Sequence, residues 1–131
     1  MNVLILGSGG REHAFAWKLL QSKLCSSLFV SPGNAGTNSI AQNVTLSNFE
    51  EIKNFCLNND IKLVVVGPEQ PLVDGIYDYF EQDVSLNKIP VIGPSKAGAM
   101  LEGSKAYCKQ FLVRHQIPTA QYKEITVENI E

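Results

Sequence analysis

Residues near the start of the chain combine glycine with polar groups in an order suited to binding an anion. An apolar run over residues 3–6 passes through Gly7-Ser8-Gly9-Gly10 into Arg11-Glu12-His13. A strand that turns through glycine into a helix leaves backbone N–H groups uncapped at the positive end of the helix dipole. Glycine also lets a ligand approach the backbone closely, because a side chain would stand in its way. We therefore predict a phosphate or nucleotide loop at residues 7–10.

Two departures from the dinucleotide fingerprint count against a nicotinamide cofactor at this loop. The fingerprint G-x-G-x-x-G places a third glycine where this chain has Glu12. It also expects an acidic residue at the end of the second strand, where the chain reads Ser31-Pro32-Gly33-Asn34. A purely structural turn remains an alternative for this segment.

Two later segments could complete a binding site beside the first loop. Residues 32–37, which include Gly33 and Asn34, form a second loop of small residues. Alone it reads as a turn, but beside the first loop its backbone donors and the Asn34 amide could cradle an anion. In a third segment Glu69 follows a strand, and its carboxylate could accept hydrogen bonds from a sugar hydroxyl. It could equally complement the dipole of the following helix.

Lys105 lies near an expected helix start, where a lysine opposes the helix dipole, so a phosphate partner would explain its position better than solvent would. An ordinary surface lysine is the alternative, and Ser104 is a candidate cap for this helix. His13 and His115 have no Cys, Asp or second His at ligand spacing, so we expect no metal site in this chain. No nucleophile–base pair is visible, and we expect no catalytic residue here.

Alternating strand and helix patterns predict the fold that must position these residues. Strands are expected over residues 2–7, 27–30, 43–46, 62–66 and 89–92, and helices over 11–23, 49–58 and 72–82. This alternation is typical of an α/β, Rossmann-like parallel sheet with helices on both faces. The glycine-rich loops leave the carboxyl ends of the strands, where ligands bind in such sheets. The inner surface of the first helix is expected to consist of Ala14, Phe15, Trp17, Leu19 and Leu20.

The pattern changes after Gly93, where two short helices over 95–102 and 104–115 precede an extended segment over 120–125. We expect one domain over residues 1–102 and the truncated beginning of a second over 103–131. The chain has 131 residues, is 44 % hydrophobic and carries a net charge of −2, which gives no reason to expect nucleic acid or membrane as a partner. Three scattered cysteines and the lack of a signal peptide favour a reduced, cytoplasmic protein.

The motifs taken together resemble one family, the phosphoribosylamine–glycine ligases (glycinamide ribonucleotide synthetases) of the ATP-grasp superfamily. The matching segments are Gly7-Ser8-Gly9-Gly10-Arg11-Glu12-His13-Ala14, Pro32-Gly33-Asn34-Ala35-Gly36-Thr37, Val66-Gly67-Pro68-Glu69 with Pro71-Leu72-Val73, Gly93-Pro94-Ser95, Leu101-Glu102-Gly103-Ser104-Lys105-Ala106 and Ile117-Pro118-Thr119-Ala120. The resemblance covers the whole chain in order. Other pre-ATP-grasp domains, such as that of biotin carboxylase, share the architecture without the first two segments.

The resemblance implies a reaction of de novo purine synthesis, in which ATP, glycine and 5-phosphoribosylamine give glycinamide ribonucleotide, ADP and phosphate. Glycyl phosphate would be the intermediate, and Mg²⁺ or Mn²⁺ would neutralise the phosphates. In the family, the N-terminal pre-ATP-grasp domain binds the phosphoribosylamine. Carried over by position, the residues beside its phosphate would be Gly9, Gly10, Gly33 and Asn34, those beside its ribose Gly67, Pro68 and Glu69, and the ATP-phosphate contact Lys105.

The length of the chain departs from the family, whose members continue through the ATP-binding and metal-binding parts. We therefore expect an N-terminal portion that binds substrate without catalysing the reaction, the metal ligands lying outside it. One alternative is a stand-alone Rossmann-type module that binds a phosphorylated metabolite or a dinucleotide. A nicotinamide-dependent oxidoreductase is a further alternative, disfavoured by Glu12 and Asn34.

Overall fold

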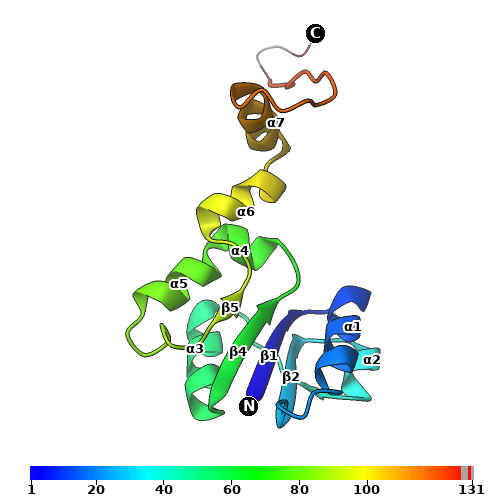
Figure 1. Ribbon diagram of the computed structural model, residues 1–131, viewed down its shortest axis with the longest axis vertical. Coiled ribbons are helices and arrows are strands. Elements are labelled where there is room, and N and C mark those ends of the chain that lie inside the picture. Colours follow the sequence, from blue (N-terminus) through cyan, green and yellow to red (C-terminus); the bar gives the residue numbers. More distant parts are fainter. Residues whose placement is uncertain (128–129, 131) are drawn as a thin grey trace.

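One five-stranded sheet forms the centre of the computed structural model, which describes residues 1–127 and 130 (Figure 1). Its strands are β1 (Asn2–Gly7), β2 (Ser27–Pro32), β3 (Gln42–Asn43), β4 (Ile61–Val66) and β5 (Val91–Ile92). They pair in the order β3-β2-β1-β4-β5, and every pairing is parallel. The chain thus builds outward from β1 through β2 and β3, then crosses to the other side of β1. This reversal confirms the α/β, Rossmann-like class and puts a topological switch point between β1 and β4.

Helices cover both faces of the sheet, as the alternation of elements predicted. On one face lie α1 (Gly10–Leu19) and α2 (Ala35–Asn38); on the other lie α3 (Phe49–Asn58), α4 (Gln70–Asp74) and α5 (Ile76–Gln82). Two more helices follow β5, namely α6 (Lys96–Gly103) and α7 (Lys105–Arg114), and they lead away from the sheet (Figure 1). In the described part of the chain, no helix has both the length and the apolar character needed to cross a bilayer.

The alternation of side chains along β1 divides the core into two clusters. Leu4 and Leu6 pack against the helices on the α3 side, whereas Val3 and Ile5 pack on the α1 side. All four side chains are buried, because successive residues of a strand point to opposite faces and both faces of β1 are covered. The continuous apolar run at the start of the chain is explained by this central position.

The predicted inner surface of α1 is wrong in most of its residues. Trp17 is 61 % exposed, and Phe15 and Leu20 are exposed as well. The side chains that face the sheet are instead Glu12 and Ala16, which are buried, together with the partly buried Leu19. Positions 12, 16 and 19 share one face of a helix. The face of α1 that packs on the sheet therefore carries a glutamate and an alanine, and not the large apolar side chains that the expectation assigned to it. The helix also ends at Leu19, short of residue 23.

Other element boundaries differ for local reasons. The helix expected over 72–82 is two helices, because Gly75 has the left-handed φ of 103° and ends α4. The turn expected over 32–37 contains the short helix α2, and β3 is confined to residues 42–43. The two helices expected after Gly93 are confirmed as α6 and α7, with Ser104 Oγ accepting a hydrogen bond from Tyr107 N–H as the N-cap of α7.

Candidate functional site

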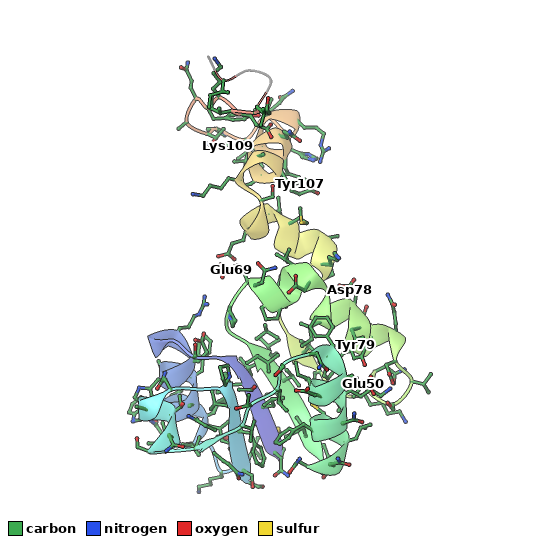
Figure 2. All side chains as sticks on the ribbon, turned by 180° about the vertical axis from the view of Figure 1, so that it is seen from behind. Glu50, Glu69, Asp78, Tyr79, Tyr107 and Lys109 are labelled. Atoms are coloured by element: carbon green, nitrogen blue, oxygen red, sulfur yellow. The ribbon has the colours of Figure 1, made fainter. Side chains whose placement is uncertain are left out.

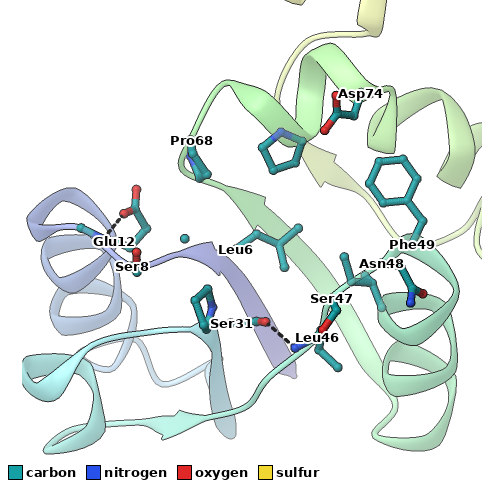
Figure 3. A pocket seen from close by; sticks show the side chains of 15 residues that line it. Leu6, Ser8, Glu12, Ser31, Leu46, Ser47, Asn48, Phe49, Pro68 and Asp74 are labelled. Carbon is teal, nitrogen blue, oxygen red and sulfur yellow. Dashed lines mark hydrogen bonds between the residues drawn. The ribbon is translucent and has the colours of Figure 1, made fainter.

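A pocket of about 450 Å³ opens at the carboxyl edge of the sheet, at the switch point between β1 and β4 (Figure 3). Its lining comes from the ends of β1 and β2 and from the segments before α1, α3 and α4. The lining residues are Leu6, Gly7, Ser8, Gly9, Glu12, Ser31, Pro32, Leu46, Ser47, Asn48, Phe49, Ile52, Pro68, Pro71 and Asp74. Ligands of doubly wound sheets bind in this crevice, so the pocket is the candidate site.

The structure brings together only part of the residues that the sequence singled out. Gly9 and Pro68 line the pocket directly. Gly10 follows Gly9 as the first residue of α1, and a Cβ added to it would meet nothing within 4 Å. The backbone N–H groups in the first turn of a helix have no partner within the helix, so this open end of α1 can offer donors.

Glu12 is the charged side chain at the centre of the glycine loop. It is only 3 % exposed, and its Oε2 accepts a hydrogen bond of 2.6 Å from Gly9 N–H (Figure 3). Its Oε1 pairs with Arg11 Nε at 3.0 Å. The position that the dinucleotide fingerprint reserves for glycine is therefore filled by a buried carboxylate. This carboxylate accepts the hydrogen bond of the Gly9 N–H group.

Asn34 holds the second loop against the first. Its Nδ2 donates to the carbonyl oxygens of Ser8 at 2.8 Å and Gly9 at 3.2 Å, and its Oδ1 accepts from Thr37 N–H. Both ends of the amide are thus engaged with the protein, and Asn34 does not belong to the pocket lining. The residue links the loops after β1 and β2.

Gly33 and Gly67 do not belong to the pocket lining either. Gly33 has a left-handed φ of 73°, and a Cβ there would collide with the side chain of Asn43. A Cβ on Gly67 would collide with the carboxylate of Glu12. Both glycines therefore serve close packing of neighbouring loops.

Glu69 and Lys105 lie further from the pocket. Glu69 is exposed and is the N-cap residue of α4, and Figure 2 shows it where α4 approaches α6. Lys105 is exposed at the first position of α7, beyond α6. Neither residue lines the pocket, so a ligand would have to extend out of it to reach them.

The sequence-based reading missed the wall opposite the glycine loop. This wall consists of residues 46–49 and Asp74 (Figure 3). Asn48 caps α3, because its Oδ1 accepts a hydrogen bond of 2.9 Å from Glu51 N–H. Ser31, buried at the end of β2, accepts from Leu46 N–H at 3.2 Å and so fixes this wall to the sheet. The polar run 47–48 just before a helix was the available signal.

The lining is mixed in character and carries no positive side chain. Glu12 and Asp74 are its two carboxylates, and Leu6, Phe49 and Ile52 give it an apolar floor. Because no Lys or Arg belongs to the lining, a phosphate here would depend on backbone N–H groups and on hydroxyls such as that of Ser8. Over residues 1–127 and 130, no group of three or more His, Cys, Asp and Glu side chains could hold a metal ion.

Comparison with known proteins shows to which family this chain is related. The family model described as "Phosphoribosylglycinamide synthetase, N domain" matches residues 1–102. A phosphoribosylamine–glycine ligase from Pasteurella multocida is 49 % identical over 130 residues, and one from Escherichia coli is 47 % identical. Each alignment covers 96 % of this chain and 29 % of the relative. The chain thus spans less than a third of the length of these curated relatives.

Solved structures show the same relationship and the wider fold. The crystal structure of phosphoribosylamine–glycine ligase from Thermotoga maritima superposes with a TM-score of 0.61 and 32 % identity, covering 92 % of this chain and 26 % of that one. The biotin carboxylase domain of a thermophilic 2-oxoglutarate carboxylase superposes with a TM-score of 0.63 at 18 % identity, covering 90 % of this chain and 28 % of that one. That second likeness concerns the fold alone. With its family match over residues 1–102, the chain belongs to the phosphoribosylglycinamide synthetase N-domain family.

Proposed function

We propose that this chain is the substrate-binding portion of a phosphoribosylamine–glycine ligase, and that its pocket at the β1–β4 switch point binds 5-phosphoribosylamine. The pocket is the observation that carries the proposal, because it joins the glycine loop before α1 to the loop before α4. The names of the relatives, phosphoribosylamine–glycine ligase, supply the substrate. The complete ligase would join glycine to this amine in purine synthesis, with ATP consumed through a glycyl phosphate.

In this proposal the phosphate of the ligand lies at the open end of α1. Gly9 and Gly10 permit close approach, and the free N–H groups of the first helical turn donate to the phosphate oxygens. Gly33 and Asn34 support that end from behind, since Asn34 binds the Ser8 and Gly9 carbonyls. The ribose lies toward Gly67, Pro68 and Glu69, with Pro68 as the lining residue.

ATP and a divalent metal belong to the complete ligase in this proposal. The described residues offer no cluster of metal ligands, so we assign the metal to parts of the full-length protein outside this segment. Lys105, exposed at the start of α7, is the residue proposed to contact an ATP phosphate. Residues 1–102 would form the substrate-binding domain and 103–131 the beginning of the ATP-grasp domain, in a cytoplasmic enzyme.

A thermal-shift experiment with matched ligands tests the proposed site. Ribose 5-phosphate, a stable mimic of the substrate, should raise the melting temperature, whereas ribose and NADH should not. Ligand at one hundred times its dissociation constant stabilises a protein by about 2.7 kcal/mol. Gly10→Val should abolish the shift by placing a branched side chain at the open end of α1, where an added Cβ meets no protein atom within 4 Å, with the unliganded melting curve of the variant as the folding control. Saturable stabilisation by NADH alone would reject the proposal.

The same proposal predicts that residues 1–131 by themselves do not catalyse ligation. ATP, glycine and phosphoribosylamine incubated with the purified chain should release ADP no faster than without protein. The reason is that the described residues include no group of three or more His, Cys, Asp and Glu side chains that could hold the metal of a magnesium–ATP complex. Turnover that persists through a second purification would contradict this assignment.

A further inference from the structure

Glu12 touches both loops that frame the pocket, although it belongs to only one of them. Within its own loop, its Oε2 accepts the Gly9 N–H at 2.6 Å. Across the switch point it packs against the backbone of Gly67, where an added Cβ would overlap the carboxylate. An added Cβ at Gly7 would stand 2.6 Å from Glu12 Cγ and 2.9 Å from Pro68 Cδ, so these groups meet in one place. The side chain therefore fills the gap between the end of β1 and the end of β4.

Burial of this carboxylate requires compensation that the site provides. A buried carboxylate is costly unless it is paired and hydrogen-bonded. Glu12 has one backbone donor, Gly9 N–H, and one cation, Arg11, whose own side chain is 55 % exposed. The positive end of α1 adds a favourable field, because Glu12 lies in the first turn. The glycines at 7, 9 and 67 leave the space in which this carboxylate fits.

A role confined to stability does not account for where the side chain lies. The first turn of a helix is also favourable for an exposed glutamate, and such a residue would need no glycine opposite it. Here the carboxylate enters the crevice, lines the pocket and abuts a loop more than fifty residues away in sequence. Its length sets both contacts, because an aspartate would draw the carboxylate back by one methylene from Gly9 and from Gly67.

We propose that Glu12 is a positioning residue for ligand binding, which sets the β1–α1 and β4–α4 loops relative to one another by the reach of its buried side chain. The proposal rests on the proposed function only for the identity of the ligand. The coupling between the two loops is a property of the unliganded protein, and it can be measured without any ligand. The matched substitutions are Glu12→Gln, which keeps length and an acceptor oxygen, and Glu12→Asp, which keeps charge but is one methylene shorter.

The first measurement follows backbone amides by NMR in the unliganded protein, with Glu102→Gln as the control at an exposed carboxylate on α6. Glu12→Asp should speed hydrogen exchange at the Gly9 amide and shift the resonance of Gly67 across the pocket. Glu12→Gln and Glu102→Gln should leave both amides close to their wild-type behaviour. Loss of protection at Gly9 with an unmoved Gly67 would overturn the proposal, because Glu12 would then act within its own loop alone.

The second measurement is the dissociation constant of ribose 5-phosphate for the same three variants. Glu12→Asp should weaken binding by about tenfold or more, the size of effect expected when a hydrogen bond to a charged group is lost from the site. Glu12→Gln, which keeps the length of the side chain, should bind ribose 5-phosphate with an affinity close to that of the wild type. A lower melting temperature with unchanged affinity in every variant would mean a merely structural role, and equal losses in both Glu12 variants would mean a role of charge; either result overturns the proposal. If wild type itself does not bind while the NMR coupling is present, the proposed function fails and the loop coupling stands.

Discussion

At the scale of single residues, the glycines around the pocket differ in what surrounds them. Gly67 faces the carboxylate of Glu12 so closely that a Cβ would overlap it, whereas the space beside Gly10 is empty to 4 Å. The two positions look alike in the sequence, since both lie between an expected strand and the expected helix that follows it. Only at Gly67 does the packing require glycine.

This difference predicts opposite results for two alanine substitutions. Gly67→Ala should lower the free energy of unfolding by about 1–3 kcal/mol, because Glu12 must move out of a packed position. Gly10→Ala should leave it within about 0.5 kcal/mol or raise it, because alanine favours a helix more than glycine does. Urea denaturation of both variants measures the difference. Equal destabilisation by the two substitutions would refute the assignment of Gly67 as the packed glycine.

At the scale of elements, an ion pair joins α3 to the end of α5. Lys53 Nζ lies 2.5 Å from Asp83 Oδ2, and Ser85 donates to Asp83 from both its backbone N–H and its hydroxyl. The hydrogen bond from Lys53 and those from Ser85 lower the pKa of Asp83 from 3.8 to about 2. The contact secures one of the helices that cover the α3 face of the sheet.

The pH dependence of stability follows from the direction of this shift. Because the pKa of Asp83 is lower in the folded chain, its contribution is complete above pH 4 and is lost as the pH falls toward 2. Asp83→Asn should therefore lower stability at pH 6 and flatten the decline between pH 4 and pH 2. Chemical denaturation across this range measures the effect, with Glu102→Gln as the control at an exposed carboxylate of α6. Parallel curves for wild type and Asp83→Asn would contradict it.

The outward face of α1 leads to a spectroscopic prediction. Trp17 is the single tryptophan of the chain and is 61 % exposed, so acrylamide should quench its emission in the folded state nearly as well as in urea. Trp17→Phe should change the free energy of unfolding by no more than about 0.5 kcal/mol, as for most exposed substitutions. Strong shielding of the emission would show that the indole is buried, as the helical pattern alone suggested.

At the scale of the whole molecule, the sheet with its covering helices is joined to an arm that leads away from it (Figure 1). The arm begins at α6, which packs on α4 so closely that a Cβ on Gly103 would strike Val73. The arm continues with α7, in which no residue is buried. The segment after α7 returns beside this helix, where Lys109 Nζ donates hydrogen bonds to Thr119 Oγ1 and to the Ala120 carbonyl oxygen (Figure 2). The sheet and the pocket owe little to the residues after α6.

Deletion of residues 105–131 should therefore leave the sheet intact. The shortened chain keeps every lining residue of the pocket and the contact of α6 with α4. Its melting temperature and its response to ribose 5-phosphate should match those of the full chain. Calorimetry with and without the ligand measures both quantities. A clear loss of either would mean that the arm supports the pocket in a way that the packing does not reveal.

The order of elements was determined by local sequence. Apolar runs of strand length, separated by helical patterns and glycine turns, predicted the parallel α/β sheet and the edge at which the loops meet. These properties depend on neighbouring residues, such as the run that becomes β1 and the Ser104 that caps α7. The local pattern did not predict which side chains of a helix are exposed to solvent. Trp17 and Ala16 are adjacent in sequence, and only the packing of α1 on the sheet shows that the alanine is the buried one.

The arrangement inside the pocket was decided by tertiary structure. Glu12 stood in the sequence as a missing glycine, and its contact with Gly67 joins segments separated by more than fifty residues. Asn34 has the amide expected of an anion ligand, yet its partners are the carbonyls of Ser8 and Gly9. Hydrogen bonds and close contacts between distant loops depend on the distances that the folded sheet sets. Residue types and spacing along one segment therefore predicted the edge of the sheet at which the pocket lies, and only the fold showed which side chains line that pocket.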